Sequence, residues 1–95
     1  MFVIKWTGLA EQDLEAIGAY YLREASVEVA TRVLARIHAT ISTLETLPNA
    51  SRAGRVTGTR ELLIHRLPYI AVVKVDERAQ LVYVLTILHT ARKFP

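Results

Sequence analysis

The sequence predicts a single α+β domain in which one opening strand is followed by two helices and then by three strands. Three patterns predict it: a β-branched and aromatic run over residues 2–6, helical apolar spacing in two stretches between residues 9 and 47, and strand-like runs after residue 59. The 95 residues suffice for one hydrophobic core and are too few for two, so the domain is expected to cover residues 1–95. The economical arrangement is one four-stranded sheet with the two-helix hairpin packed on one face and the other face partly open.

Composition narrows the class of protein. With 52% hydrophobic residues and a mean hydropathy of +0.24, the chain is apolar for a small domain, and some apolar surface is expected to await a partner. No apolar run approaches the roughly 18 to 20 residues that span a bilayer, and residues 1–6 lack the pattern of a signal peptide. We therefore expect a cytoplasmic protein without a membrane partner. The absence of cysteine, together with three scattered histidines, predicts no disulfide, metal or cofactor.

Charge is distributed unevenly along the chain. Residues 1–47 hold four basic and six acidic side chains, a net charge of −2, whereas residues 48–95 hold eight basic and three acidic ones, a net charge of +5. A basic surface favours contact with nucleic acid or with an acidic protein, and charge alone does not separate the two.

The first helix is predicted over Leu9–Glu24, with Thr7 as its N-cap. Its apolar stripe repeats at steps of four, three and four and consists of Ala10, Leu14, Ile17 and Tyr21. The second helix is predicted to follow Ser26 and to stop at Pro48-Asn49. Both helices carry further apolar residues outside their stripes, namely Ala16, Ala19 and Tyr20 on the first and Val29, Val33 and Leu47 on the second. The hairpin therefore has apolar surface left to bury.

Residues 48–59 are rich in turn formers and are predicted to be a connecting loop. Three strands are predicted after it, over Arg60–Leu67, Tyr69–Asp76 and Leu81–Leu88. The last of them is apolar on both faces, as a central strand is, whereas Leu63-Ile64-His65-Arg66 mixes in charge, as an edge strand does. The turn over residues 76–80 makes the last two strands a hairpin.

Four pieces of sequence stand in a distinctive order along nearly the whole chain. They are Ala10-x-x-Asp13-Leu14-x-x-Ile17-x-x-Tyr20, Gly54-Arg55 leading to Thr59-Arg60-Glu61-Leu62, Pro68-Tyr69, and Ile87-Leu88-His89-x-Ala91-Arg92. In this order and at these separations they resemble the RelE/ParE toxin superfamily, in particular its ParE, or plasmid-stabilisation, branch. The resemblance implies a β-α-α-β-β-β fold with a mostly antiparallel sheet. It also implies a toxin of a type II toxin-antitoxin system, held inactive by a cognate antitoxin.

Two activities divide the family that the chain resembles. RelE-like members are ribosome-dependent endonucleases of messenger RNA, whereas ParE-like members bind and poison DNA gyrase. A metal-free ribonuclease needs a base, an acid and cations around the phosphate, and the candidates here are His89, Arg92, Arg60, Arg66 and Tyr69. The arginine that the nucleases place at the start of the penultimate strand falls at Pro68-Tyr69, and their lysine cluster is missing. The resemblance therefore favours a gyrase poison, with no enzyme activity, over RNA cleavage.

The individual residues have structural interpretations as well. His89, at a strand end, is typical of a side chain that fixes a tail, and Arg60 could form a salt bridge with Glu61 where the strand begins. As functional residues, Arg60, His89, Arg92 and Lys93 are the candidates for binding the target. Ala16, Tyr20, Val29 and Val33 are the candidates for binding the antitoxin, since antitoxins of this kind fold over their toxin with an amphipathic segment. A small RNA-binding or regulatory domain is a further alternative, but the sequence lacks the paired aromatics of an RNA-recognition strand.

Overall fold

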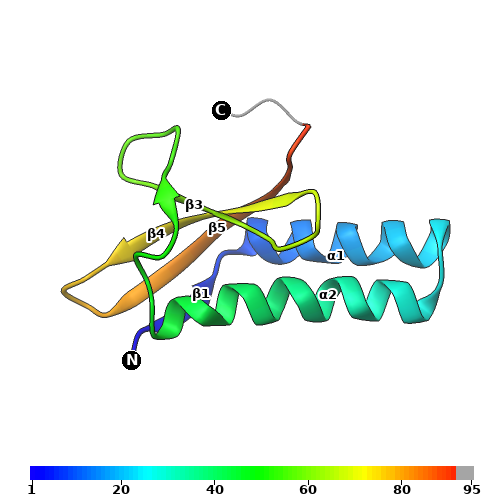
Figure 1. Cartoon of the computed structure of the whole chain (residues 1–95), viewed down its shortest axis with the longest axis horizontal. Coiled ribbons are helices and arrows are strands. Elements are labelled where there is room, and N and C mark those ends of the chain that lie inside the picture. The colour runs from blue at the N-terminus through cyan, green and yellow to red at the C-terminus, as the bar shows by residue number, and fades with distance from the viewer. Residues whose placement is uncertain (92–95) are drawn as a thin grey trace.

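In the computed structural model, which describes residues 1–91, two helices lie on one face of a five-stranded sheet (Figure 1). The predicted α+β class and the order of the elements are confirmed, and the sheet has one strand more than predicted. Within residues 1–91, no helix is long and apolar enough to cross a membrane.

Both predicted helix caps are confirmed. Helix α1 (Gly8–Glu24) begins after Thr7, whose Oγ1 accepts a hydrogen bond from the N–H of Ala10 at 3.1 Å. Helix α2 (Val27–Ser42) begins after Ser26, whose Oγ accepts from the N–H of Val29 at 3.1 Å. Each cap satisfies an N–H group that the first helical turn leaves without a partner. The chain leaves α2 through a short 3₁₀ helix, η1 (Thr43–Glu45).

The sheet has the strand order β1-β5-β4-β3-β2. In chain order its strands are β1 (Val3–Trp6), β2 (Arg52–Ala53), β3 (Arg60–Leu63), β4 (Tyr69–Asp76) and β5 (Leu81–His89). Only β1 and β5 pair in parallel; the other neighbours are antiparallel. The prediction that the last strand is central is therefore confirmed.

Two segments differ from the prediction. The predicted loop contains β2, which pairs with β3 and becomes the edge strand, and such a short strand carries no periodic signal. The strand predicted over Arg60–Leu67 stops at Leu63, and the prediction that His65 and Arg66 lie on an edge strand is wrong. They lie in a tight turn in which the N–H of Ile64 donates to the carbonyl of Tyr69 at 3.0 Å and Arg66 has a φ of 62°.

The hydrophobic core lies between the helices and the sheet. Its largest fully buried members under the helices include Ile37, Ile41, Leu44, Ile64, Val73, Val82 and Val84. Val33 also belongs to this core and is only 8% exposed, so the interpretation of Val33 as surplus apolar surface is wrong. The buried face of α2 includes Val33 beside Ala30, Ile37 and Ile41, because the helix packs against both α1 and the sheet.

The side chains at the centre of the opposite face of the sheet are buried. Side chains alternate along a strand, and Ala71 and Val73 belong to the core under the helices, so Ile70 and Val72 point the other way. They are nevertheless 5% and 1% exposed. The segment that contains β2 stands on this side of the sheet (Figure 1), and the face that remains open is smaller than predicted.

Helix α1 is tied to β5 where that strand bulges. The register between β4 and β5 shifts between Val72 and Val73, which leaves Leu85 as the extra residue. The hydroxyl of Thr7 donates to the carbonyls of Val84 and Leu85 at 3.0 and 2.9 Å. Six residues further on, Oδ2 of Asp13 accepts from the N–H of Ile87 at 3.0 Å and from the hydroxyl of Thr86. Side chains of α1 thus take the place of a strand neighbour beyond the end of β1.

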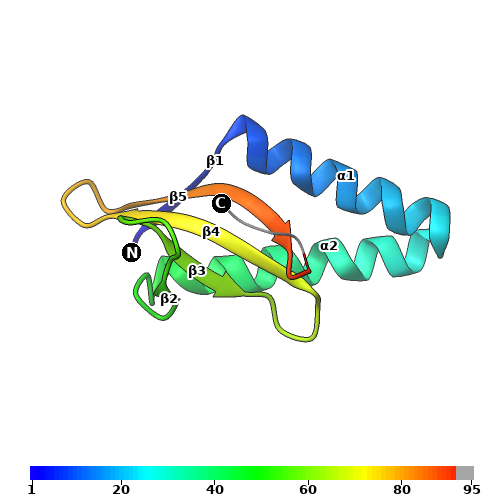
Figure 2. The same cartoon turned by 90° about the horizontal axis from the view of Figure 1, so that it is seen from above.

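The helical hairpin is displaced lengthwise relative to the sheet that it covers. Its turn, at Ala25-Ser26, extends beyond the ends of the strands in both views (Figures 1 and 2). Three large apolar side chains near this end are 48%, 55% and 61% exposed; they are Tyr20, Leu22 and Val27. We call this part of the hairpin, residues 20–27, the overhang.

Replacing Asp13 by alanine is expected to destabilise the fold by about 1–3 kcal/mol, because the N–H of Ile87 and the hydroxyl of Thr86 lose their acceptor. Urea unfolding at neutral pH measures the change. Glu15→Ala is the matched control: it removes an exposed carboxylate from the same helix and should shift stability by less than about 0.5 kcal/mol. Equal stability of the two variants would contradict the anchoring role of Asp13.

Candidate functional site

A cavity of 360 Å³ opens between α1 and the adjoining ends of β4 and β5. We call it the tyrosine cavity; it is lined by Asp13, Ala16, Ile17, Tyr20, Tyr21, Tyr69, Ile87 and His89. Among the residues that the structure describes, its lining includes a carboxylate and three phenols but no lysine or arginine. The described part of this lining therefore offers a phosphate group no arginine or lysine.

Tyr69 forms the inner wall of the tyrosine cavity. It is 7% exposed and pairs across the sheet with His89; their rings lie 5.5 Å apart at 83°. Its hydroxyl lies 3.5 Å from that of Tyr21. Burial raises the pKa of Tyr69, and the contact with Tyr21 raises it further. The phenol is therefore held in its protonated form and is unsuited to act as a base at neutral pH.

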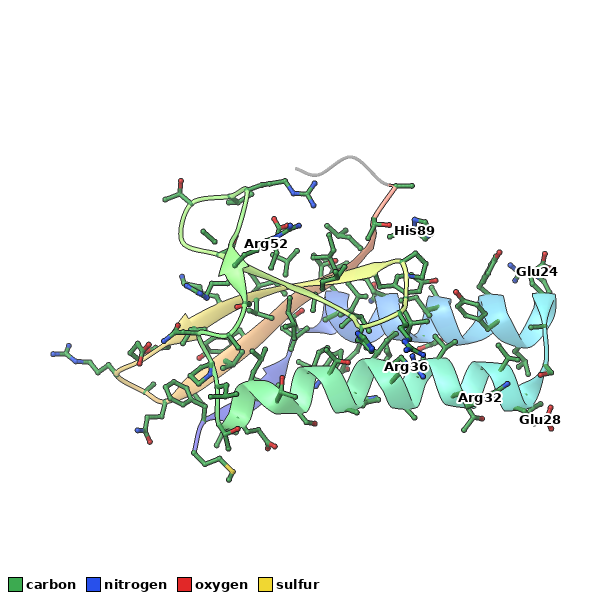
Figure 3. All side chains as sticks on the ribbon, viewed as in Figure 1. Glu24, Glu28, Arg32, Arg36, Arg52 and His89 are labelled. Carbon is green, nitrogen blue, oxygen red and sulfur yellow. The ribbon has the colours of Figure 1, made fainter. Side chains whose placement is uncertain are left out.

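His89 is exposed at the end of β5, where Figure 3 shows it on the outer side of the strand end. Its Nδ1 accepts a hydrogen bond from the N–H of Ala91 at 3.1 Å. This contact uses the lone pair of Nδ1, so it requires that Nδ1 carry no proton. The contact supports the structural interpretation of His89, in which the ring orders the chain that leaves β5.

Arg60 does not lie with His89. Its register partner is Val73, four residues along β4 from Tyr69, which corresponds to about 13 Å. Its Nε donates to Oγ of Ser51 at 3.0 Å, and its Nη2 donates to the carbonyl of Asn49 at 3.0 Å and to that of Ser51. The guanidinium therefore holds the segment that precedes β2. The salt bridge with Glu61, the structural alternative considered for Arg60, does not form, because Glu61 pairs with Arg52 and Arg55.

Glu61 is instead the centre of an arginine cluster that the sequence analysis missed. Its carboxylate is 1% exposed and lies 3.3 Å from Nη2 of Arg52 and 3.2 Å from Nε of Arg55. The backbone N–H of Arg55 also donates to it, at 2.9 Å. Two arginines at six and nine residues before a glutamate on an apolar strand were the only sequence signal, and it is a weak one.

The pKa of Glu61 reflects this environment. Burial by itself raises the pKa of this carboxyl group, but the hydrogen bonds and charges of Arg55 and Arg52 outweigh it. The result is a pKa below the ordinary value of 4.5. Glu61 is thus ionised at neutral pH, and it neutralises part of the basic charge of this half of the chain.

The remaining predicted nuclease and target-binding residues are Arg66, Arg92 and Lys93. Arg66 is exposed in the turn between β3 and β4. Arg92 and Lys93 lie outside the described residues. Of the four candidate nuclease residues within residues 1–91, the structure brings Tyr69 and His89 together and places Arg60 and Arg66 elsewhere.

The four residues predicted to bind an antitoxin fall into two hollows. Ala16 and Tyr20 line the tyrosine cavity. Val29 and Val33 border a second hollow of 210 Å³, which also contacts Arg32, Arg36 and Leu67. Figure 3 shows Arg32 and Arg36 one turn apart along α2. Leu67, in the turn between β3 and β4, borders the second hollow, and Tyr69, the first residue of β4, lines the tyrosine cavity.

Comparison with known proteins identifies the family. The family described as ParE toxin of type II toxin-antitoxin system, parDE, matches residues 4–94 of this chain. The chain belongs to the ParE toxin family. The resemblance inferred from its sequence pieces is thereby confirmed, and the protein is a toxin of the type II toxin-antitoxin class.

Relatives support this assignment over almost the full length. The candidate toxin Y4kP of Sinorhizobium fredii is 34% identical over 92 residues, which cover 97% of this chain and 92% of the relative. A chain of the chromosomal ParDE system of P. aeruginosa superposes with a TM-score of 0.85 at 30% identity, covering 94% of this chain and 96% of that one. A chain of the E. coli RelBE toxin-antitoxin complex, with a TM-score of 0.71, 12% identity and coverage of 98% and 100%, shares the fold.

The lowered pKa of Glu61 predicts acid sensitivity of this ParE-family fold. Its ionised form stabilises the folded state fully above pH 4.5, and this contribution is lost as the pH falls below 4.5 through the lower pKa of the folded state. In urea unfolding between pH 7 and pH 3, the variant Glu61→Gln should lose less stability than the original chain does. Glu15→Gln, on exposed α1 surface, should retain the original pH dependence. Parallel pH profiles for Glu61→Gln and the original chain would contradict this assignment.

Proposed function

We propose that this ParE-family toxin stops growth by binding DNA gyrase, that it does not cleave messenger RNA, and that a cognate antitoxin neutralises it. The lining of the tyrosine cavity is the observation that favours DNA gyrase over messenger RNA as the target. Among the predicted nuclease residues within residues 1–91, His89 is the one that is both exposed and within a cavity, and its neighbours there are Asp13 and three tyrosines. A carboxylate beside the reacting phosphate repels it.

The candidate proton-transfer groups, His89 and Tyr69, also argue against RNA cleavage. Nδ1 of His89 accepts from the N–H of Ala91, and Tyr69 is held protonated by burial. Arg60, the cation on β3, is engaged with Asn49 and Ser51 and stands about 13 Å away along the sheet. RNA cleavage needs a base, an acid and a cation within reach of one phosphate. The described residues offer a binding surface more readily than such a centre.

An antitoxin partner is supported by the relatives and by the surface of the hairpin. The structurally similar chains come from a ParDE system and from RelBE toxin-antitoxin complexes. In this chain the overhang leaves Tyr20, Leu22 and Val27 largely exposed. A segment that folds onto the hairpin would bury these side chains, and such coupled folding buries a large area.

The proposed target is tested by inducing the chain in cells that carry a reporter of DNA damage and by mapping messenger RNA ends in the same culture. We expect induction of the damage response with intact messages. Purified chain should also inhibit supercoiling by DNA gyrase. Reporter strains with a gyrase inhibitor and with a known messenger RNA nuclease provide the two positive controls.

The alternative is an RNA endonuclease of the RelE kind. It would show ribosome-dependent cuts in messages that disappear in His89→Ala, and supercoiling would be unaffected. That result would reverse the proposal. Tyr83→Leu, a substitution on the same strand but outside the tyrosine cavity, is the control for general loss of fold.

The exposed overhang also predicts how the chain behaves without its partner. Purified alone, it should aggregate or self-associate, whereas co-expression with the product of the adjoining gene should yield a soluble complex. The double variant Leu22→Lys and Val27→Lys should reduce the self-association, as measured by analytical ultracentrifugation. Lys substitutions at Arg32 and Arg36, which keep the charge of an exposed part of α2, serve as the control. A monomer at high concentration in the original chain would contradict the prediction.

A further inference from the structure

The tyrosine cavity has aromatic walls from two separate parts of the fold. Tyr20 and Tyr21 come from α1, with ring centres 5.1 Å apart and ring planes at 90°. Tyr69 comes from the first position of β4, and its ring stands edge-on to His89. Because Tyr69 is buried and Tyr20 is 48% exposed, the rings extend from the inner wall to the mouth of the cavity.

The carboxylate of Asp13, of which one oxygen accepts hydrogen bonds, lines the cavity together with these rings. Oδ2 of Asp13 accepts two hydrogen bonds, from Thr86 and from the N–H of Ile87. Oδ1 of Asp13 has no hydrogen-bond partner within the described part of the chain. The cavity lining therefore combines one negative charge, free acceptor capacity and the electron-rich faces of tyrosine rings. These features favour a cation and disfavour an anion.

The chain itself already places a guanidinium against this cluster. Cζ of Arg23 lies 5.9 Å from the ring centre of Tyr20, within the range of a cation–π contact. Arg23 also lies 3.6 Å from the carboxylate of Glu24. Arg23 does not line the cavity, so no arginine or lysine of residues 1–91 belongs to its lining.

We propose that the tyrosine cavity binds the guanidinium of an arginine side chain presented by the cognate antitoxin. Arginine fits better than lysine because its flat, weakly hydrated head stacks on aromatic rings and still donates to a carboxylate oxygen. The antitoxin as the source rests on the proposed function. Ala16 and Tyr20 lie one helical turn apart on exposed α1 surface, so a segment running along α1 passes over the mouth of the cavity. The same segment would cover His89, a predicted target-binding residue.

The cavity chemistry is tested by NMR of the tyrosine ring signals, with N-acetyl-arginine amide as the probe. The sample is the full chain carrying Leu22→Lys and Val27→Lys, which reduce self-association and lie outside the cavity lining. We expect saturable shifts of Tyr20, Tyr21 and Tyr69 at millimolar probe. N-acetyl-norleucine amide and N-acetyl-glutamate amide, the apolar and anionic counterparts, should bind at least about fivefold more weakly. Equal binding of the apolar probe, or tighter binding of the anionic one, would overturn the proposed preference for a cation.

Two variants localise the probe. Tyr20→Leu replaces an exposed ring and should weaken binding of the arginine probe by about fivefold while the fold is retained. Tyr83→Leu removes a tyrosine of β5 that does not line the cavity, and the affinity should stay unchanged. If the two variants bind the probe equally, the arginine probe does not occupy this cavity.

The source of the arginine is tested on the complex co-purified with the product of the adjoining gene. If the antitoxin fills the cavity, the arginine probe should leave the ring signals of Tyr21 and Tyr69 unchanged in the complex. Probe binding at the affinity of the free chain would exclude the antitoxin as the occupant. Neither result depends on the cellular target, because gyrase inhibition is measured separately and on the chain alone.

Discussion

The attachment of α1 to the bulged part of β5 is the contact on which the rest of the structure depends. Strand β1 ends at Trp6, opposite Val84, so the following part of β5 has no strand neighbour on that side. Thr7 and Asp13 supply hydrogen bonds to the backbone there. This attachment also sets the course of α1 past the end of the sheet, which brings Tyr20 and Tyr21 against Tyr69 and creates the tyrosine cavity.

The arginine cluster around Glu61 shows that part of the basic charge in the second half of the chain has a structural role. Arg52 and Arg55 contact the buried carboxylate, and Arg60 binds backbone carbonyls of the segment before β2. These three cations hold the two-residue strand and its loop in place. A surplus of arginine in a sequence is therefore not by itself a surface for nucleic acid, because buried acceptors can engage the guanidinium groups.

The elements that could be predicted are those with a local cause. Thr7 and Ser26 cap helices through contacts three residues away, and the apolar run of the last strand reflects burial on both faces. The segments that were missed have distant causes. Strand β2 exists because β3 offers it an edge, and Arg66 lies in a turn because the chain must reverse into β4. Neither cause is visible in a window of neighbouring residues.

The sequence by itself determined the order of the helices and strands, the central place of the last strand and the membership of the toxin family, since each is encoded in local spacing or in ordered motifs. Only the tertiary structure decided which candidate residues share a site. It brought Tyr69 and His89 together with Asp13 and Tyr20, and it separated Arg60 from them. The physical reason is strand register and helix placement: residues adjacent in the chain point to opposite faces, while residues more than 70 positions apart meet through one hydrogen bond, as Asp13 and Ile87 do.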